Sequence, residues 1–168
     1  LTLNAGTTNY FELGNSTTPG VSSDLINVVG NLEPNGAPIV ISSLNTLVVP
    51  GTYRLFNYSG AKTTSFGAVV VADARYTATL DESVSGQVNV TLSGTSSGLT
   101  WSGGGANSWD VNTSTNWNNN TEKFFNSDAA SFNNGSASNT VNLVGSLYPS
   151  TVSVNSDSNY IFGGAGKL

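Results

Sequence analysis

Cysteine, histidine and methionine are all absent from this 168-residue chain, and charged residues make up only 9% of it. Without cysteine the chain has neither disulfides nor thiolate metal ligands. Without histidine it lacks the commonest general base and zinc ligand, so no Ser-His-Asp or Cys-His arrangement can form. The absence of methionine suits an oxidising exterior. Together these absences leave paired carboxylates as the remaining catalytic option and favour an extracellular location.

Basic residues are scarce, and the formal net charge is −5 with a pI near 4.2. The five basic residues form no cluster, which argues against nucleic acid as a partner; they are Arg54, Lys62, Arg75, Lys123 and Lys167. No apolar run approaches the roughly 18 residues of a transmembrane helix, so we expect no membrane span in this segment. The chain starts at Leu1 without an initiator methionine or a signal sequence, which predicts a mature or excised segment.

Small polar residues dominate the composition: Gly, Asn, Ser and Thr together make up about half of the chain. Hydrophobic residues still account for 38% and aromatic residues for 10%, and they recur in short alternating runs. This pattern predicts a folded β protein rather than a disordered one. No window of ten residues has a helical period, so we expect no α-helix.

Short alternating runs bounded by Gly, Asn, Pro or Asp predict the strands. In the first half we expect them at Thr8–Leu13, Asp24–Val29, Ile39–Leu44, Thr52–Tyr58, Phe66–Val71, Arg75–Leu80 and Gln87–Leu92. In the second half we expect them at Leu99–Ser102, Phe124–Asn126, Ala129–Phe132, Thr140–Val144, Thr151–Val154 and Asn159–Phe162. The run TYRLFNY has apolar residues on both faces, which predicts a strand covered on both sides.

Paired carboxylates are the remaining candidates for acid–base chemistry. They are Glu12, Asp24, Glu33, Asp73, Asp81, Glu82, Asp110, Glu122 and Asp128. The adjacent pair Asp81–Glu82 falls in the expected turn LDESVSG, and neighbours in a strand would point to opposite faces. We therefore expect no enzyme; a polysaccharide-degrading β protein would need clustered carboxylates or a basic residue in a groove.

Asp110 and Asp128 lie among many asparagines and are the weak candidates for a calcium site. The nonapeptide G-G-x-G-x-D of calcium-binding repeats does not occur. Capping of turns is the competing interpretation, and we expect no cofactor. The triplet GGG at 103–105 lacks the lysine and the helix that a phosphate loop requires.

All three tryptophans lie in the segment LTWSGGGANSWDVNTSTNW, as Trp101, Trp109 and Trp117, evenly spaced along the chain. Large aromatic side chains bury much apolar surface, so three of them in a polar segment predict a small local core. Exposed and coplanar, the same rings could instead stack on sugars. Both interpretations remain open from the sequence.

The second half of the chain resembles bacterial surface proteins that contain autotransporter-associated β-strand repeats. In that family a W-x-G-G-x-x-x-x-W-D segment and an N-W pair lead into a D-x-x-x-F strand, followed by Pro-Ser-x-V-x-V and Y-x-F-x-G-x-G-x-L. The matching residues are Trp101, Gly103, Gly104, Trp109, Asp110, Asn116, Trp117, Asp128, Phe132, Pro149, Ser150, Val152, Val154, Tyr160, Phe162, Gly164, Gly166 and Leu168. The first half, from LTLNAGTTNYFELG onward, is similar to segments that close the passenger regions of such proteins.

The resemblance implies a right-handed parallel β-helix, or β-solenoid, and β-sandwich-like modules are the alternative. We expect a β module at 1–93, a Gly/Ser-rich junction at 94–98, and a Trp-rich β module at 99–168 that leads into a repeat strand. The family's iterated G-x-G-x-L-T-L-x-G units are missing between the two halves. Joined head to tail, however, the chain ends read GGAGKL–LTLNAG, close to such a unit.

These observations predict a non-catalytic structural repeat of an extracellular bacterial fibre or filament, with a mechanical or adhesive role. Its partners would be other copies of itself, head to tail or in tandem, and surface polysaccharide. The residues expected to form the assembly strands are Leu1, Thr2, Leu3, Tyr160, Ile161, Phe162, Lys167 and Leu168. The alternative is a carbohydrate-binding module of a secreted or surface protein, which requires exposed tryptophans.

Overall fold

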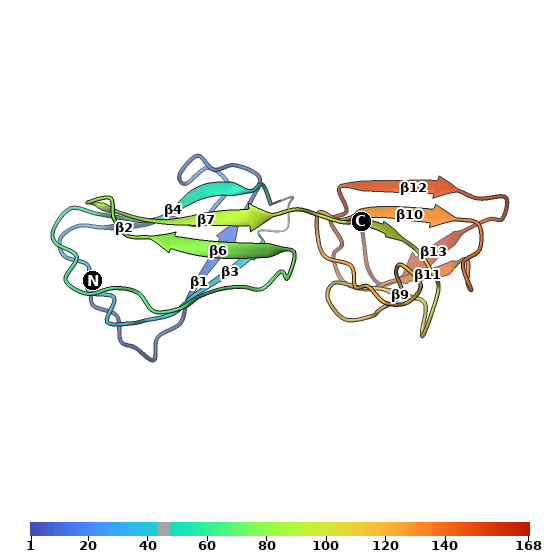
Figure 1. The fold of residues 1–168 in the computed structure, drawn as a ribbon, viewed down its shortest axis with the longest axis horizontal. Coiled ribbons are helices and arrows are strands. Elements are labelled where there is room, and N and C mark those ends of the chain that lie inside the picture. Colours follow the sequence, from blue (N-terminus) through green and yellow to red (C-terminus); the bar gives the residue numbers. More distant parts are fainter. Residues whose placement is uncertain (44–47) are drawn as a thin grey trace. The chain divides into compact units, whose positions relative to one another are not determined.

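A computed structural model describes residues 1–43 and 48–168, and within these residues it contains β-strands and no helix (Figure 1). The prediction of an all-β chain is therefore confirmed. The described residues divide into two compact units, which we call unit 1 (residues 1–43 and 48–95) and unit 2 (residues 96–168). The Gly/Ser-rich stretch 94–98 connects the last strand of unit 1 to the first strand of unit 2. The part of the chain that the structure describes contains no helix that could span a membrane.

Unit 1 contains two small sheets. Its strands are β1 (Asn9–Leu13), β2 (Ile26–Val28), β3 (Ile39–Ser43), β4 (Gly51–Tyr58), β5 (Val69–Val71), β6 (Tyr76–Asp81) and β7 (Gln87–Gly94). One sheet has the order β1-β3-β5 and is entirely parallel. The other has the order β2-β4-β7-β6, in which β2 and β4 are parallel while β7 is antiparallel to both of its neighbours.

The parallel pairs of unit 1 share a constant spacing along the chain. Asn9 pairs with Ile39 and Ile39 pairs with Val69, so the two successive steps are equally long. In the other sheet Asn27 pairs with Asn57 at the same interval. Polar side chains follow this spacing too, because Asn57 Nδ2 donates to Asn27 Oδ1 over 2.8 Å. The interval along the chain between paired residues is therefore the same in both sheets of unit 1.

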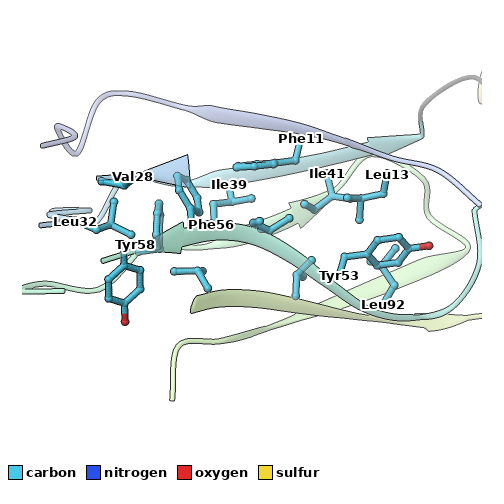
Figure 2. Packing of buried hydrophobic residues seen from close by; sticks show 14 residues of the cluster. Phe11, Leu13, Val28, Leu32, Ile39, Ile41, Tyr53, Phe56, Tyr58 and Leu92 are labelled. Atoms are coloured by element: carbon cyan, nitrogen blue, oxygen red, sulfur yellow. The ribbon is translucent and has the colours of Figure 1, made fainter. Parts of the chain in front are cut away.

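The core of unit 1 lies between these two sheets and is built from the inward positions of each strand (Figure 2). Phe11 and Ile41 are paired across β1 and β3, and both are fully buried. Phe56 contacts Phe11 edge-on, with ring centroids 5.2 Å apart. In β4 the successive residues Leu55 and Phe56 are both fully buried, because a bulge between Arg54 and Phe56 turns both side chains toward the same core. The opposite face of β4 is polar and is not buried, so the prediction of a strand covered on both sides is wrong.

Unit 2 contains two three-stranded parallel sheets. Its strands are β8 (Gly98–Thr100), β9 (Ser108–Trp109), β10 (Ala129–Asn133), β11 (Thr140–Leu143), β12 (Thr151–Asn155) and β13 (Ile161–Gly164). The orders are β12-β10-β8 and β13-β11-β9, and Figure 1 shows β12 running alongside β10. The first step, from Gly98 to Ala129, is close in length to the steps of unit 1, whereas the next step, from Ala129 to Thr151, is clearly shorter. The stack is thus less regular than that of unit 1.

Two details of the expected strands differ from the structure. Phe124–Asn126 is not a strand, since Phe124 makes only an isolated bridge with Val111 and the chain turns at Ser127, whose φ is 78°. Conversely, Ser108–Trp109 pairs with Asn142 and Leu143 although its glycine-rich approach is typical of a turn. Of the expected strand Ile39–Leu44, the last residue, Leu44, lies outside the described residues.

Candidate assembly edge and tryptophan cluster

Strands β12 and β13 are the outermost strands of the two sheets of unit 2. Each pairs on one side only, β12 with β10 and β13 with β11, and within residues 96–168 no strand lies on the other side. Backbone N–H and C=O groups on that outer side therefore lack ladder partners there. We call β12, β13 and the following Lys167 and Leu168 the open edge.

The inward side chains of β12 are only partly covered. Val152 is paired with Ala130 and Val154 with Phe132, and paired residues of parallel strands point to the same face. Ala130 and Phe132 are completely buried, whereas Val152 and Val154 remain 44% and 53% exposed. The valines thus continue the inward-facing rows of β10 but have no further layer above them.

In the β13-β11-β9 sheet and at residues 167–168, outer residues are likewise more exposed than the inner residues with which they pair. Phe162 is paired with the buried Val141 and is itself partly exposed. A parallel bridge joins Ser146 to Lys167, which aligns the next residues, Leu147 and Leu168. Leu147 is 1% exposed and Leu168 58%. Apolar side chains of the open edge therefore repeat the pattern of the covered layer beneath them.

Two other outer strands, β1 and β8, are closed by short antiparallel segments. Residues 22–24 close the outer side of β1, where Asp24 N donates to Glu12 O over 3.0 Å and Leu13 bridges to Ser23. Residues 116–118 close the outer side of β8 in the same way. There Ser102 N donates to Asn116 O and Asn118 N to Thr100 O, over 2.9 and 2.8 Å.

Trp117, in the segment that closes β8, belongs to the tryptophan cluster, which we define as Trp101, Trp109, Trp117 and Phe124. All four side chains are buried, and none is more than 2% exposed. Trp117 packs edge-on against both other tryptophans, at centroid distances of 5.1 and 5.3 Å. Phe132 packs against Trp109 and, at a centroid distance of 4.9 Å, against Phe162. The cluster is thus continuous with the aromatic rings of the open edge.

Burial of the tryptophans bears on sugar binding. Stacking on a sugar needs an exposed ring face, and these faces are covered by neighbouring aromatic rings. The indole Nε1–H of Trp101 donates to Ser138 O over 2.8 Å, while that of Trp109 has no hydrogen-bond partner among the described residues. The cluster therefore acts as a local core, and it offers no platform of coplanar exposed rings.

The remaining expected assembly residues lie in unit 1 and at the end of unit 2. Thr2 makes a parallel bridge with Glu33, flanked by Leu3 N donating to Glu33 O and Glu33 N donating to Leu1 O, both over 2.9 Å. Leu1 is 50% exposed. In unit 2 the hydroxyl of Tyr160 donates to Asn133 O, and Ile161 is 64% exposed. Both segments are thus strand edges with exposed apolar side chains.

Asp110 and Asp128 each cap a turn. The Asp110 carboxylate accepts hydrogen bonds from Ser114 N and Ser114 Oγ, both over 2.7 Å. Asp128 is fully buried, and its two oxygens accept from Ser97 N and Phe125 N, over 2.7 and 3.0 Å. Among the described residues no three potential ligands gather as a metal site would require.

Two further carboxylates, the adjacent Asp81 and Glu82, also serve local structure. Glu82 forms an ion pair with Lys62 at 3.2 Å and accepts from Phe66 N. Its neighbour Asp81 accepts from the hydroxyl and the amide of Ser83, and these hydrogen bonds lower the pKa of Asp81 below its ordinary value. The two side chains therefore serve different partners.

Comparison with known proteins gives a partial similarity to a curated adhesin. Over 104 residues the chain is 34% identical to the "Adhesin BmaC autotransporter" of Brucella suis biovar 1 (strain 1330). The matched part is 61% of this chain but 3% of the adhesin, so the chain spans a small fraction of that protein. No family model matches the chain, and no solved structure matches it. The similarity agrees with a bacterial surface protein related to autotransporters.

Proposed function

We propose that this chain is a non-catalytic structural segment of an adhesive protein on the bacterial surface, and that copies associate end to end through their terminal β-strands. The single observation that supports association best is the open edge. There Val152, Val154 and Leu168 repeat the inward pattern of the layer beneath them while remaining about half exposed. The adhesive role is supported by the partial similarity to an autotransporter adhesin.

We also propose that the stacked parallel strands are successive coils of a β-helix. A constant step in both sheets of unit 1 is the pattern that coils of equal length produce. The hydrogen bonds between Asn57 and Asn27, and between Thr64 and Asn35, join side chains of neighbouring layers. In unit 2 the shorter second step corresponds to a coil with shorter connections.

The partner proposed for the open edge is the Leu1–Leu3 segment of a second copy. This segment already forms one rung of a parallel stack, and its Thr2 backbone has no hydrogen-bond partner among the described residues. The sequence GGAGKL–LTLNAG, which the two ends give when joined head to tail, is close to a repeat unit of the resembling family. Strand addition of this kind gives affinity through backbone hydrogen bonds and specificity through the inward side chains.

Sedimentation velocity of the 168-residue chain over a wide concentration range tests the association. We expect species larger than the 17.3 kDa monomer to grow with concentration. Val154→Lys should suppress them, because a charge would replace an apolar side chain that must be covered in the contact. Deletion of Leu1–Leu3 should suppress them as well.

Ser153→Lys is the matched control, because it adds the same charge to the same exposed strand but on the opposite face. It should leave association unchanged. A chain that stays monomeric at every concentration, or a Val154→Lys variant that associates like the wild type, would contradict end-to-end association. Circular dichroism of each variant verifies that the β structure is retained.

A further inference from the structure

A cleft of about 680 Å³ opens beside the tryptophan cluster, between the turn that joins β10 to β11 and the residues after Trp117. Its lining is composed of small polar residues around one indole: Thr100, Trp101, Ser102, Asn118, Asn119, Asn120, Asn134, Gly135, Ser136 and Ala137. We call it the asparagine cleft. None of its lining residues belongs to the open edge, so it is a separate feature of unit 2.

No lining residue of the asparagine cleft carries a charge. Its polar groups are carboxamides, hydroxyls and backbone amides, which together both donate and accept hydrogen bonds. An anionic or cationic ligand would find no counter-charge among them. A neutral polyhydroxyl ligand, whose hydroxyls also donate and accept, matches this lining in chemistry.

Three consecutive asparagines hold one wall of the cleft in an unusual backbone conformation. Asn118, Asn119 and Asn120 have φ angles of 47°, 61° and 60°, in the left-handed region that L residues other than asparagine seldom adopt. Backbone conformations of this kind persist where surrounding structure enforces them, and they gather at functional sites. The wall is therefore a fixed feature of the fold.

Neighbouring contacts enforce this wall. Asn118 Oδ1 accepts from Thr100 N over 2.8 Å, and Asn119 N donates to Ser102 Oγ over 2.7 Å. The side chain of Asn120 lies against Gly104, where an added Cβ would come within 2.5 Å of Asn120 Oδ1. Behind the wall, Trp101 is held by its indole hydrogen bond to Ser138 O. These contacts fix the backbone of the wall, residues 118–120, and the indole of Trp101 without a ligand.

Two carboxamides of this wall are available to bind a ligand. Asn119 and Asn120 are exposed, and their side-chain amides have no hydrogen-bond partner among residues 1–43 and 48–168. In contrast, Asn118 uses its carboxamide within the fold, as does Asn134, whose Oδ1 accepts from Asp157 N. Because the backbone that carries these two carboxamides is already fixed, only their side-chain rotations have to be ordered when a ligand pairs with them.

We propose that the asparagine cleft binds a neutral glycan, with the carboxamides of Asn119 and Asn120 as its principal hydrogen-bonding groups. The proposal rests on the adhesive role put forward above and names the class of ligand that this role would use. It does not depend on association between copies. It also differs from stacking on exposed tryptophans, because the Trp101 indole is fixed behind the wall and the hydrogen bonds come from the asparagines.

A glycan array that carries both neutral and acidic glycans tests the proposal on the full chain. The informative variant is Asn119→Gly/Asn120→Gly, because glycine keeps the left-handed backbone and removes only the carboxamides. Asn112→Gly is the matched control: Asn112 is also an exposed left-handed asparagine, with a φ of 53°, and it does not line the cleft. Positive glycans are then titrated by NMR, following the amides of residues 118–120 and the Trp101 indole.

We expect binding to neutral glycans only, weakened at least about tenfold by the double variant and unchanged by Asn112→Gly. Binding to acidic glycans alone, no binding to any glycan, or full binding by the double variant would overturn the proposal. The titration uses the Val154→Lys variant as well as the wild type, so glycan binding is measured with and without an intact open edge. Loss of association and loss of glycan binding are therefore seen separately.

Discussion

The outer strands β1 of unit 1 and β12 of unit 2 both lie at the edge of a parallel sheet, but only β1 is covered. In unit 1 the inward residues Phe11 and Leu13 of the outer strand β1 are completely buried, and residues 22–24 close its edge. In unit 2 the inward residues Val152 and Val154 of the outer strand β12 stay about half exposed. A position at the edge of a sheet therefore does not by itself explain the exposure.

The difference lies in the path that the chain takes after each strand. After β1 the chain turns back at Gly14, and residues 22–24 run antiparallel to β1. The backbone amides of Glu12 and Gly14 then donate to the side chains of Asp24 and Ser23. After Trp109 a long excursion returns as residues 116–118 and closes β8. After β12 the chain instead proceeds to the next sheet as β13. Closure thus comes from a hairpin-like return, and strands without one remain available for pairing.

Trp117→Ala should have the largest effect, because it removes the residue that closes the first layer of unit 2. Trp117 contacts Trp101, Trp109 and Phe124, and it is completely buried. We expect the free energy of unfolding to fall by about 3–5 kcal/mol, as for other large-to-small core substitutions. Denaturant unfolding followed by circular dichroism measures this loss. A loss below about 1 kcal/mol would show that the cluster does not hold unit 2 together.

Paired valine substitutions probe the covered and the uncovered layers of unit 2 directly. Val141→Ala, at a completely buried site, should lower the free energy of unfolding by about 2 kcal/mol. Val154→Ala, at a site that is 53% exposed, should lower it by less than about 1 kcal/mol. Both are measured in dilute protein, where copies do not associate. Equal losses would mean that Val154 is covered in the monomer.

Tyr53→Phe should have the smallest effect of the buried-site changes, and it tests how unit 1 closes around β4. The Tyr53 hydroxyl has one hydrogen to donate and lies within hydrogen-bond distance of two carbonyl oxygens, Val49 O at 2.6 Å and Gly14 O at 2.9 Å. Its loss should lower the free energy of unfolding by about 1–2 kcal/mol. All three tryptophans lie in unit 2, so their emission serves as an internal reference for that unit. The change should appear in circular dichroism at lower denaturant concentrations than in the wild type.

The Tyr53 substitution also has a pH signature. Burial raises the pKa of Tyr53 above the ordinary value of 10.0, because the phenolate would be poorly solvated there. Its stabilising contribution is therefore complete below about pH 10 and declines as the pH rises, since the unfolded chain ionises first. The stability difference between wild type and Tyr53→Phe should shrink above about pH 10. A difference that stays constant across the alkaline range would contradict this assignment.

The sequence predicted the strands well wherever apolar residues alternate. The run TYRLFNY became β4, although a bulge gathers its buried side chains on one face instead of two, and Ala129–Phe132 became most of β10. The prediction failed where pairing depends on distant partners. Ser108–Trp109 has a strand partner only because Leu143 lies beside it, and Phe124 ends up in the tryptophan cluster rather than in a ladder. Parallel pairing between strands so far apart along the chain leaves no local signal of this kind.

The features of the candidate sites were predicted to different degrees. Apolar residues near both chain ends indicated the assembly strands, but the identity of Val152 and Val154 as the uncovered inward positions needed the register with β10. The local-core and sugar-stacking interpretations of the tryptophans could not be separated by composition, because burial is decided by the fold. The asparagine cleft had no sequence signal beyond NNN, since three left-handed residues in a row are a property of the folded backbone.

Hydrogen–deuterium exchange at low and high protein concentration tests the open edge most directly. The outward-pointing amides of β12 and β13 should exchange rapidly in dilute protein and become protected as the concentration rises. Amides of β10 and β11, which pair on both sides, should stay protected throughout. Val154→Lys should abolish the concentration dependence, and Ser153→Lys should preserve it. Exchange in β12 and β13 that is the same at every concentration would contradict the claim that this edge receives a further strand.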